Sequence, residues 1–420
     1  MSLRYNGPAA VVLLLALMVA CGKDSSNPVT QTGPGTDTQP PEAINDLSLA
    51  YDEGNDAVRF TWTARRDDAD HARPDHLDIR YGSSFPFDWE RATVVDPTPT
   101  PAAPGTAQLY VLPHPIRGRD VYASVRAWDE SGNESAAGNV GHVRVPGFAF
   151  AAVCTDAFSG APVAGLDAVV TARTVHQLST GADGRIELTD LAQGSLGVLL
   201  NTGTASTLYH SLSDVLTLDH NLSLAYPMIP FQDPQSDLYP SILALLVEAM
   251  FAPGSSHVVK HWPAYPVPVY IPDFVSSLGV DYHAFAVQAA ERWNSRVGFP
   301  MFTPVAADPP VGVLMEFLPR STMGTVNGVT DYTSTADGHP LHDRIRIVDD
   351  ITDTTKLYLI VMHELGHTIR LGHLPAGFIM YGSQPLPPDI SDDEVSLVQL
   401  LLALPDGTDL QKYDASPPAP

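Results

Sequence analysis

Residues 363–373 read His-Glu-Leu-Gly-His-Thr-Ile-Arg-Leu-Gly-His, and this stretch decides the fold and the chemistry of the C-terminal part of the chain. Side chains four positions apart lie on one face of a helix, so His363 and His367 can bind one metal ion, with Glu364 beside them. A catalytic zinc ion takes three protein ligands and keeps one position for water. His373 is the third candidate ligand, and the chain must leave the helix to present it.

The surrounding sequence favours this interpretation. Residues 354–369 are apolar with helical periodicity, and Thr352 or Asp353 can cap the start of a helix there. An isolated histidine on such a helix is usually a packed core residue. Two histidines that flank a carboxylate are costly to bury unless a metal satisfies them, so the pattern predicts a metal site.

The motif resembles a known family. His363, Glu364, His367 and His373 match the zinc-binding motif of the metzincin metallopeptidases, and residues 379–381 (Ile-Met-Tyr) resemble their Met-turn. The resemblance is closest to the matrixins. Further similar segments are a first strand at 267–271, an Ala-x-x-x-Trp-Asn helix at 289–294, a capping box at 391–394 and a closing helix at 395–404.

The resemblance covers about residues 262–411 and implies an α/β (α+β) zinc peptidase domain. In that family the glutamate, here Glu364, is the general base for a zinc-bound water. Met380 is expected to pack below the metal as a hydrophobic floor, since a thioether is a poor zinc ligand. Tyr381 either lines the pocket or packs. By resemblance, the strand at 311–318 is the edge to which an extended substrate adds, whereas its apolar sequence alone indicates only a buried strand.

One position departs from the family pattern. Arg370 stands where the family has glycine, at the point where the helix breaks. If the backbone there needs a positive φ, a residue with a side chain costs roughly 1 kcal/mol. The turn is then either strained at Arg370 or shifted toward Gly372. A strained turn predicts that Arg370→Gly holds or raises activity. Leu374 also departs, because matrixins usually have serine after the third ligand.

The amino terminus indicates export. Arg4 precedes an apolar run at 9–20, and Cys21 follows small residues, as in the lipobox of bacterial lipoproteins. We therefore expect residues 1–21 to be a lipoprotein signal, with lipidation of Cys21, and residues 22–40 to be a disordered tether. An ordinary signal peptide with an incidental cysteine is the alternative. The lipoprotein interpretation predicts a protein anchored by lipid to the bacterial cell envelope or cell surface.

The region between the tether and the motif predicts two all-β sandwich domains. Residues 41–146 show short strands separated by turns and resemble a fibronectin type III domain, with Trp62 in the sandwich core. Residues 147–226 resemble a carboxypeptidase regulatory-like β-sandwich, in which Cys154 is a small buried strand residue. Residues 227–261 are expected to form a linker with a short helix, with a pro-segment across the cleft as the alternative, and residues 412–420 a disordered tail.

Length and net charge limit the classes of function that the chain can have. The chain has 420 residues, which suits several domains, and its formal net charge of -25 disfavours nucleic acid as a partner. Aspartate-rich loops are candidate sites for structural Ca2+. The expected partners are protein or peptide substrates and a membrane reached through the lipid anchor. Two alternatives stay open: a surface binding or adhesion lipoprotein whose peptidase fold has lost activity, and a metal hydrolase that acts on a substrate other than protein.

Overall fold

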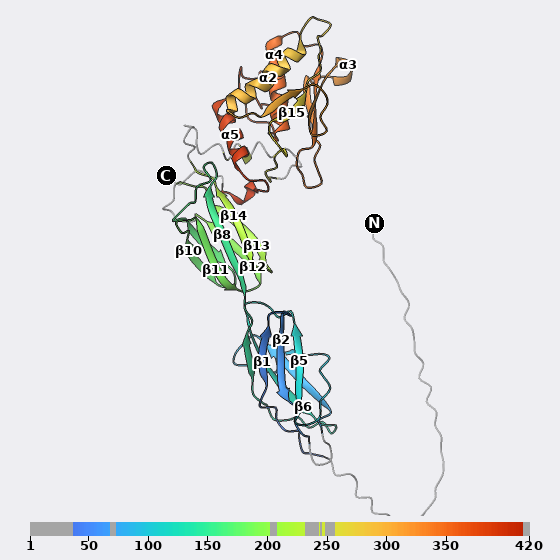
Figure 1. The fold of residues 1–420 in the computed structure, drawn as a ribbon, viewed down its shortest axis with the longest axis vertical. Helices are drawn as coiled ribbons and strands as arrows, with labels where there is room; N and C mark the ends of the chain where they lie inside the picture. Colours follow the sequence, from blue (N-terminus) through green and yellow to red (C-terminus); the bar gives the residue numbers. More distant parts are fainter. Residues whose placement is uncertain are drawn as a thin grey trace, which may run out of the picture.

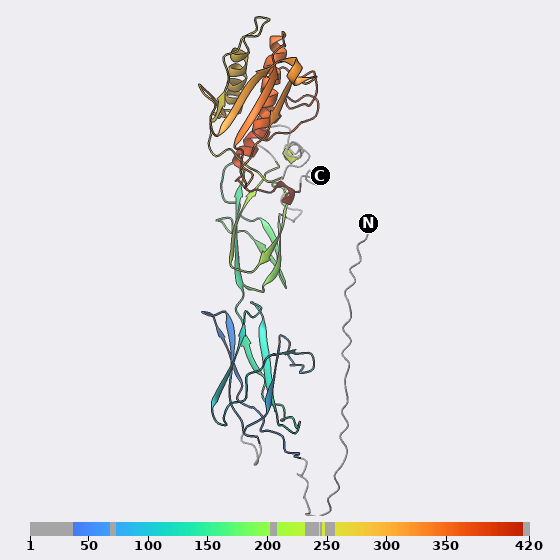
Figure 2. The same ribbon diagram turned by 90° about the vertical axis from the view of Figure 1, so that its right-hand side faces the viewer.

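The computed structural model describes residues 37–67, 73–201, 208–231 and 257–414, together with Leu243, Leu246 and Val247. Two β-sandwich units and a third unit of mixed helices and strands follow one another along the long axis of the molecule (Figure 1, Figure 2). The predicted signal, Cys21, and most of the predicted tether and linker helix lie outside the described residues. In the described part of the chain, no helix is long and apolar enough to cross a membrane.

The first unit consists of a three-stranded sheet in the order β1-β2-β5 and a four-stranded sheet in the order β4-β3-β6-β7. Alternate side chains of β2 face inward, among them Phe60 and Trp62, so Trp62 is a core residue, as predicted. The strands are β1 (Ser48–Asp52), β2 (Ala57–Thr63), β3 (His76–Gly82), β4 (Thr93–Val94), β5 (Ala107–Pro113), β6 (Asp120–Trp128) and β7 (Gly141–Arg144).

The second unit pairs the sheets β10-β9-β12-β13 and β11-β8-β14. Cys154 on β8 is fully buried, so the prediction of a buried strand residue is confirmed, and burial raises the pKa of its thiol to about 12. The strands are β8 (Phe148–Asp156), β9 (Asp167–Thr171), β10 (Val175–Ser179), β11 (Arg185–Leu191), β12 (Gly194–Leu200), β13 (Leu212–Leu218) and β14 (Leu222–Met228).

The third unit is built on a five-stranded sheet in the order β16-β15-β17-β19-β18, in which only β18 runs antiparallel to its neighbour. The prediction that residues 311–318 form the edge strand is wrong, because β17 pairs with a strand on each side. Its elements are β15 (Val267–Tyr270), α2 (Tyr282–Val297), β16 (Phe302–Val305), β17 (Gly312–Leu318), α3 (Arg320–Met323), β18 (Gly328–Asp331), β19 (His342–Val348), α4 (Thr354–Thr368), α5 (Asp392–Ala403) and the 3₁₀ turn η1 (Leu410–Lys412).

Helix α2 packs against α4 and holds it in place. Trp293 is fully buried, and its indole Nε1 donates to the carbonyl of Met362, 2.9 Å away on α4. The side chain of Asn294 accepts from the backbone N–H groups of Met301 and Phe302, which fixes the start of β16. Trp293 therefore positions the helix that carries the histidine motif, and Asn294 positions the start of β16.

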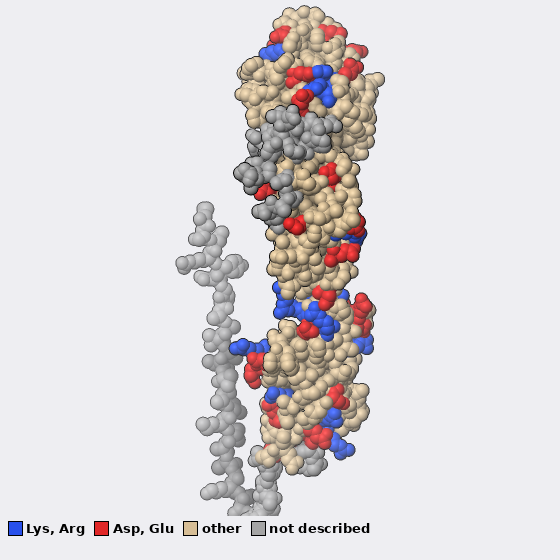
Figure 3. All heavy atoms as spheres, turned by 90° about the vertical axis from the view of Figure 1, so that its left-hand side faces the viewer, with Lys and Arg blue, Asp and Glu red and all other residues tan. Residues whose placement is uncertain are grey.

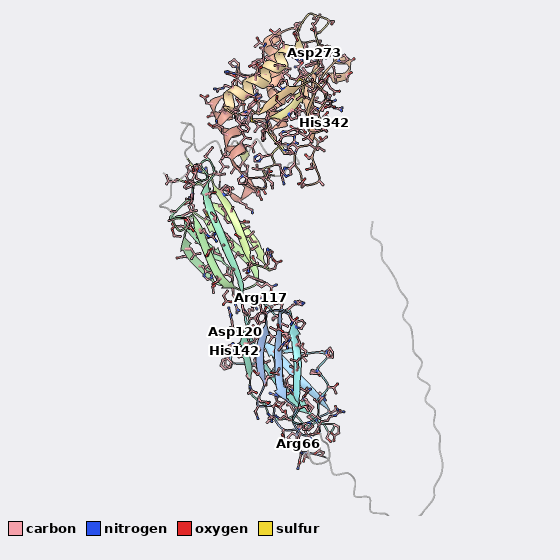
Figure 4. All side chains as sticks on the ribbon, viewed as in Figure 1. Arg66, Arg117, Asp120, His142, Asp273 and His342 are labelled. Carbon is pink, nitrogen blue, oxygen red and sulfur yellow. The ribbon has the colours of Figure 1, made fainter. Side chains whose placement is uncertain are left out.

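Two different junctions connect the units. Between the first and second units the contacts are mostly polar: Arg144 contacts both Asp120 and Asp190, and Arg117 lies over the ring of Phe148. Charged side chains of both signs gather at this junction (Figure 3), where Figure 4 labels Arg117 and Asp120. The second and third units share one hydrophobic core. Lys412 and Tyr413, expected in a disordered tail, instead contact the second unit, because burial of the aromatic ring of Tyr413 there is favourable.

Candidate metal centre

Helix α4 and the turn after it position the three predicted ligands. Asp353 caps the helix by accepting from two backbone N–H groups, and His363 and His367 lie one turn apart near its end. The chain then leaves the helix and returns to bring His373 beside them. The candidate ligand atoms of the three side chains all lie within 4.8 Å of one another.

Hydrogen bonds to two backbone carbonyls set the tautomers of the buried histidines. Nδ1 of His363 donates to the carbonyl of Ile379, and Nδ1 of His367 donates to that of Leu371, both at 2.7 Å. Because a carbonyl only accepts, each proton lies on Nδ1, and each Nε2 presents a lone pair. The two Nε2 atoms lie 3.1 Å apart. Because neither of them carries a proton, this contact is between lone pairs and is not a hydrogen bond.

This donor set fits a zinc ion. Two nitrogens bound at 2.0–2.1 Å to a tetrahedral ion lie about 3.4 Å apart, close to the separation of the two Nε2 atoms. Burial lowers the pKa of His363 to about 4 and that of His367 to about 3, so both rings are neutral at pH 7, as metal binding requires. Among the described residues, no other group of three or more His, Cys, Asp or Glu meets the same geometry.

Glu364 lies beside the triad and is only 5% exposed. Burial raises the pKa of its carboxyl to about 7, and a hydrogen bond from the hydroxyl of Thr330, 2.7 Å away, opposes that shift. Thr330 is on β18, the strand that lies at the edge of the sheet. A Cβ at Gly328 on the same strand would lie 2.5 Å from a carboxylate oxygen of Glu364, so glycine is needed there.

The sequence did not predict the role of Thr330 or Gly328. β18 has only four residues, too few for a reliable alternation of apolar and polar side chains. The register of β18 on β19 determines which of its side chains faces α4, and that pairing cannot be read from a short segment.

The predicted Met-turn packs below the triad. Met380 is fully buried, and a Cβ at Gly366 on α4 would overlap its sulfur, so the glycine of the motif allows this close packing. The backbone N–H of Met380 donates to the carboxylate of Glu394, 3.0 Å away. The same carboxylate accepts from Ser391 in the predicted capping box of α5. Met380 therefore lies where a hydrophobic floor was expected.

The triad opens into a cavity of about 580 Å³. The lining residues include the 325–330 segment with Tyr332, and also Tyr381, Ser383 and Leu386. Tyr381 is half-buried and lines the cavity, which decides between the two expectations for it. Apart from the histidines and Glu364, the lining side chains are uncharged.

Comparison with known proteins leaves the family open. No protein-family model and no curated protein matches the chain. Solved structures similar to parts of it include an Fn3-like protein from Clostridium thermocellum, with 17% identity, 25% of this chain and 94% of that chain covered, and a TM-score of 0.19. The group B streptococcus pilus 2b backbone protein has 11% identity, with 44% of this chain and 96% of that chain covered, and a TM-score of 0.21. The FN1-FN3 domains of chicken CNTN1 have 10% identity, with 46% of this chain and 67% of that chain covered, and a TM-score of 0.22. At such TM-scores the matches carry no argument about function.

Proposed function

We propose that the chain is a zinc-dependent endopeptidase of the metzincin type, most similar to the matrixins. The observation that carries this proposal is the geometry of the triad: two neutral imidazoles with facing Nε2 lone pairs, a third histidine beside them and a buried carboxylate next to the site. The fibronectin type III and carboxypeptidase regulatory-like identities of the two β-sandwich units belong to the same proposal, since they rest on sequence resemblance.

His363, His367 and His373 would hold the ion. A bound zinc supplies Lewis acidity toward a carbonyl and lowers the pKa of a coordinated water. Glu364 accepts the proton of the attacking water and delivers it to the leaving amine. The hydroxyl of Thr330 holds the glutamate in place by donating to one carboxylate oxygen, which leaves the other for the water.

An extended peptide fits the site. β18 ends the sheet, and within the described residues it pairs only with β19, so its other side can form backbone hydrogen bonds with a substrate strand. Residues 328–330 of this strand border the cavity beside Glu364. These features favour peptide bonds in protein substrates over small molecules.

The proposed location is the bacterial cell surface, with a lipid on Cys21. The support comes from the apolar run at 9–20 and the small residues before Cys21. Mass spectrometry of the amino-terminal peptide of the mature protein tests this. An acyl-glyceryl modification on Cys21 is the expected result, and an unmodified Cys21 in a freely secreted protein would exclude the anchor.

The test of function is cleavage of casein and of a peptide library by the purified protein, with and without a zinc chelator. Cleavage that a chelator abolishes and added zinc restores is the expected result. A protein that binds zinc and cleaves nothing would favour the binding or adhesion alternative. Zinc-dependent hydrolysis of ester or amide substrates without peptide cleavage would favour a hydrolase of another class.

A further inference from the structure

We propose that Arg370 is a positioning residue of the metal centre, whose guanidinium fastens the turn between His367 and His373 to strand β19 and to the wall of the cavity. The inference rests on the proposed function, because it assigns Arg370 a task at the same site. It explains why an arginine occupies a backbone position that favours glycine.

The backbone of Arg370 has the conformation that a side chain disfavours. Its φ is 68°, in the left-handed region, and Gly372 is not among the residues with positive φ. The N–H of Arg370 donates to the carbonyl of His367 at 2.9 Å, and that of Leu371 donates to Gly366 at 3.3 Å. The turn is therefore strained at Arg370, the first of the two alternatives from the sequence, and side-chain contacts must offset the cost.

Those contacts centre on one buried carboxylate. Nη1 of Arg370 donates to Oδ2 of Asp343 at 2.7 Å, and Nη2 donates to the carbonyl of Thr333 at 3.3 Å. Asp343 is on β19 and is fully buried. Its Oδ1 accepts the backbone N–H of Thr333 at 3.0 Å. One carboxylate thus joins the ligand turn to the segment that follows β18.

Arg370 affects the metal centre and the cavity through two sets of contacts. The residue after it, Leu371, provides the carbonyl that accepts from Nδ1 of His367, so the position of the turn sets the orientation of that imidazole. The guanidinium also lies 4.9 Å from the ring centroid of Tyr332, and Tyr332 lines the cavity. Loss of the side chain would loosen both a metal ligand and the substrate wall.

The same contacts oppose the expectation that Arg370→Gly holds or raises activity. Glycine relieves the positive φ, but it leaves Asp343 buried without its cation. Burial raises the pKa of Asp343, and Arg370 acts against that shift by charge and hydrogen bonding. A buried carboxylate that loses its partner is strongly destabilising, more so than one strained backbone position.

The experiment compares variants of the full-length protein in three measurements. Zinc affinity is measured by competition with a chromophoric chelator, and KM and kcat are measured at saturating zinc. The third measurement is thermal unfolding of the metal-free protein. We expect Arg370→Gly to weaken zinc binding about tenfold and to raise KM by about threefold or more. Arg370→Lys, which keeps the charge, should recover part of both losses. Arg370→Gly with Asp343→Asn should regain thermal stability but not zinc affinity, because the uncompensated charge is removed while the turn stays untied.

Arg292→Gln is the matched control. Arg292 also forms a bidentate pair with an aspartate of the same unit, Asp389, but neither residue lines the cavity. The zinc affinity and KM of the Arg292→Gln variant should stay within about twofold of wild type. If Arg370→Gly binds zinc as tightly as wild type, keeps its KM and melts no lower, the inference fails. A wild-type protein that binds zinc but cleaves no peptide would overturn the proposed function alone, since the zinc affinities still test Arg370.

Discussion

Thr330 and Glu364 are 34 positions apart in the sequence, yet one hydroxyl holds the proposed general base. Glu364 is buried on α4, and among the described residues Thr330 is the one side chain that donates a hydrogen bond to its carboxylate. The hydroxyl also opposes the effect of burial on the carboxyl pKa. At the scale of single residues, the site depends on side chains that the zinc-binding motif does not contain.

Thr330→Val tests this dependence, because valine keeps the branched shape and removes the donor. We expect kcat to fall about tenfold, the usual cost of one hydrogen bond to a charged group, with zinc content unchanged. Thr330→Ser keeps the hydroxyl and should stay within about twofold of wild type. Equal kcat values for the valine and serine variants would show that the hydroxyl does not position Glu364.

At the scale of elements, α4 and the Met-turn must approach closely. Gly366 faces the sulfur of Met380, and Glu394 at the start of α5 anchors the backbone of Met380. His363 in turn donates to the carbonyl of the neighbouring Ile379. The spacing between helix and turn therefore sets the orientation of a proposed metal ligand.

Gly366→Ala should destabilise the third unit, although alanine normally favours a helix. The added Cβ overlaps Met380, and overpacking of this kind costs about 1–3 kcal/mol. We expect a lower melting temperature and weaker zinc binding, measured by calorimetry and chelator competition. Gly54→Ala, at a turn of the first unit where a Cβ meets nothing closer than 3.6 Å, is the control and should change neither. A variant at Gly366 as stable as wild type would contradict the packing argument.

Local elements could be predicted from the sequence, whereas long-range pairings could not. The helix at α4, its cap at Asp353 and the capping box at Ser391 follow from residues close in the chain. The edge strand was assigned to β17 instead of β18, because strand order depends on contacts between distant segments. The Arg370–Asp343 pair was missed for the same reason, so the cost at Arg370 was visible in the sequence and its compensation was not.

At the scale of the whole molecule, the second and third units form one packed body. Tyr413 is 7% exposed, and its hydroxyl donates to the carbonyl of Pro227 on β14. Nζ of Lys412 lies 2.8 Å from the largely buried carboxylate of Asp214 on β13. Lys412 and Tyr413 thus connect the third unit back to the second, while the joint to the first unit is mainly polar.

Tyr413→Ala should weaken this attachment. Removal of a buried aromatic side chain costs about 3–5 kcal/mol, so we expect earlier unfolding and faster proteolysis between the second and third units. The kcat for a short peptide should change little, because Tyr413 does not line the cavity. Gln411→Ala, an exposed neighbour, is the control. Unchanged proteolysis in the Tyr413 variant would contradict the shared-core account.

The central claim, that the triad and Glu364 form a zinc peptidase site, is tested most directly by measuring zinc content and peptide cleavage together in wild type, Glu364→Ala and His367→Ala. We predict about one zinc ion per chain in wild type and in Glu364→Ala, with cleavage by Glu364→Ala reduced by at least two to four orders of magnitude. His367→Ala should lose both zinc and cleavage. A wild-type protein without zinc, or cleavage that survives in Glu364→Ala, would contradict the account.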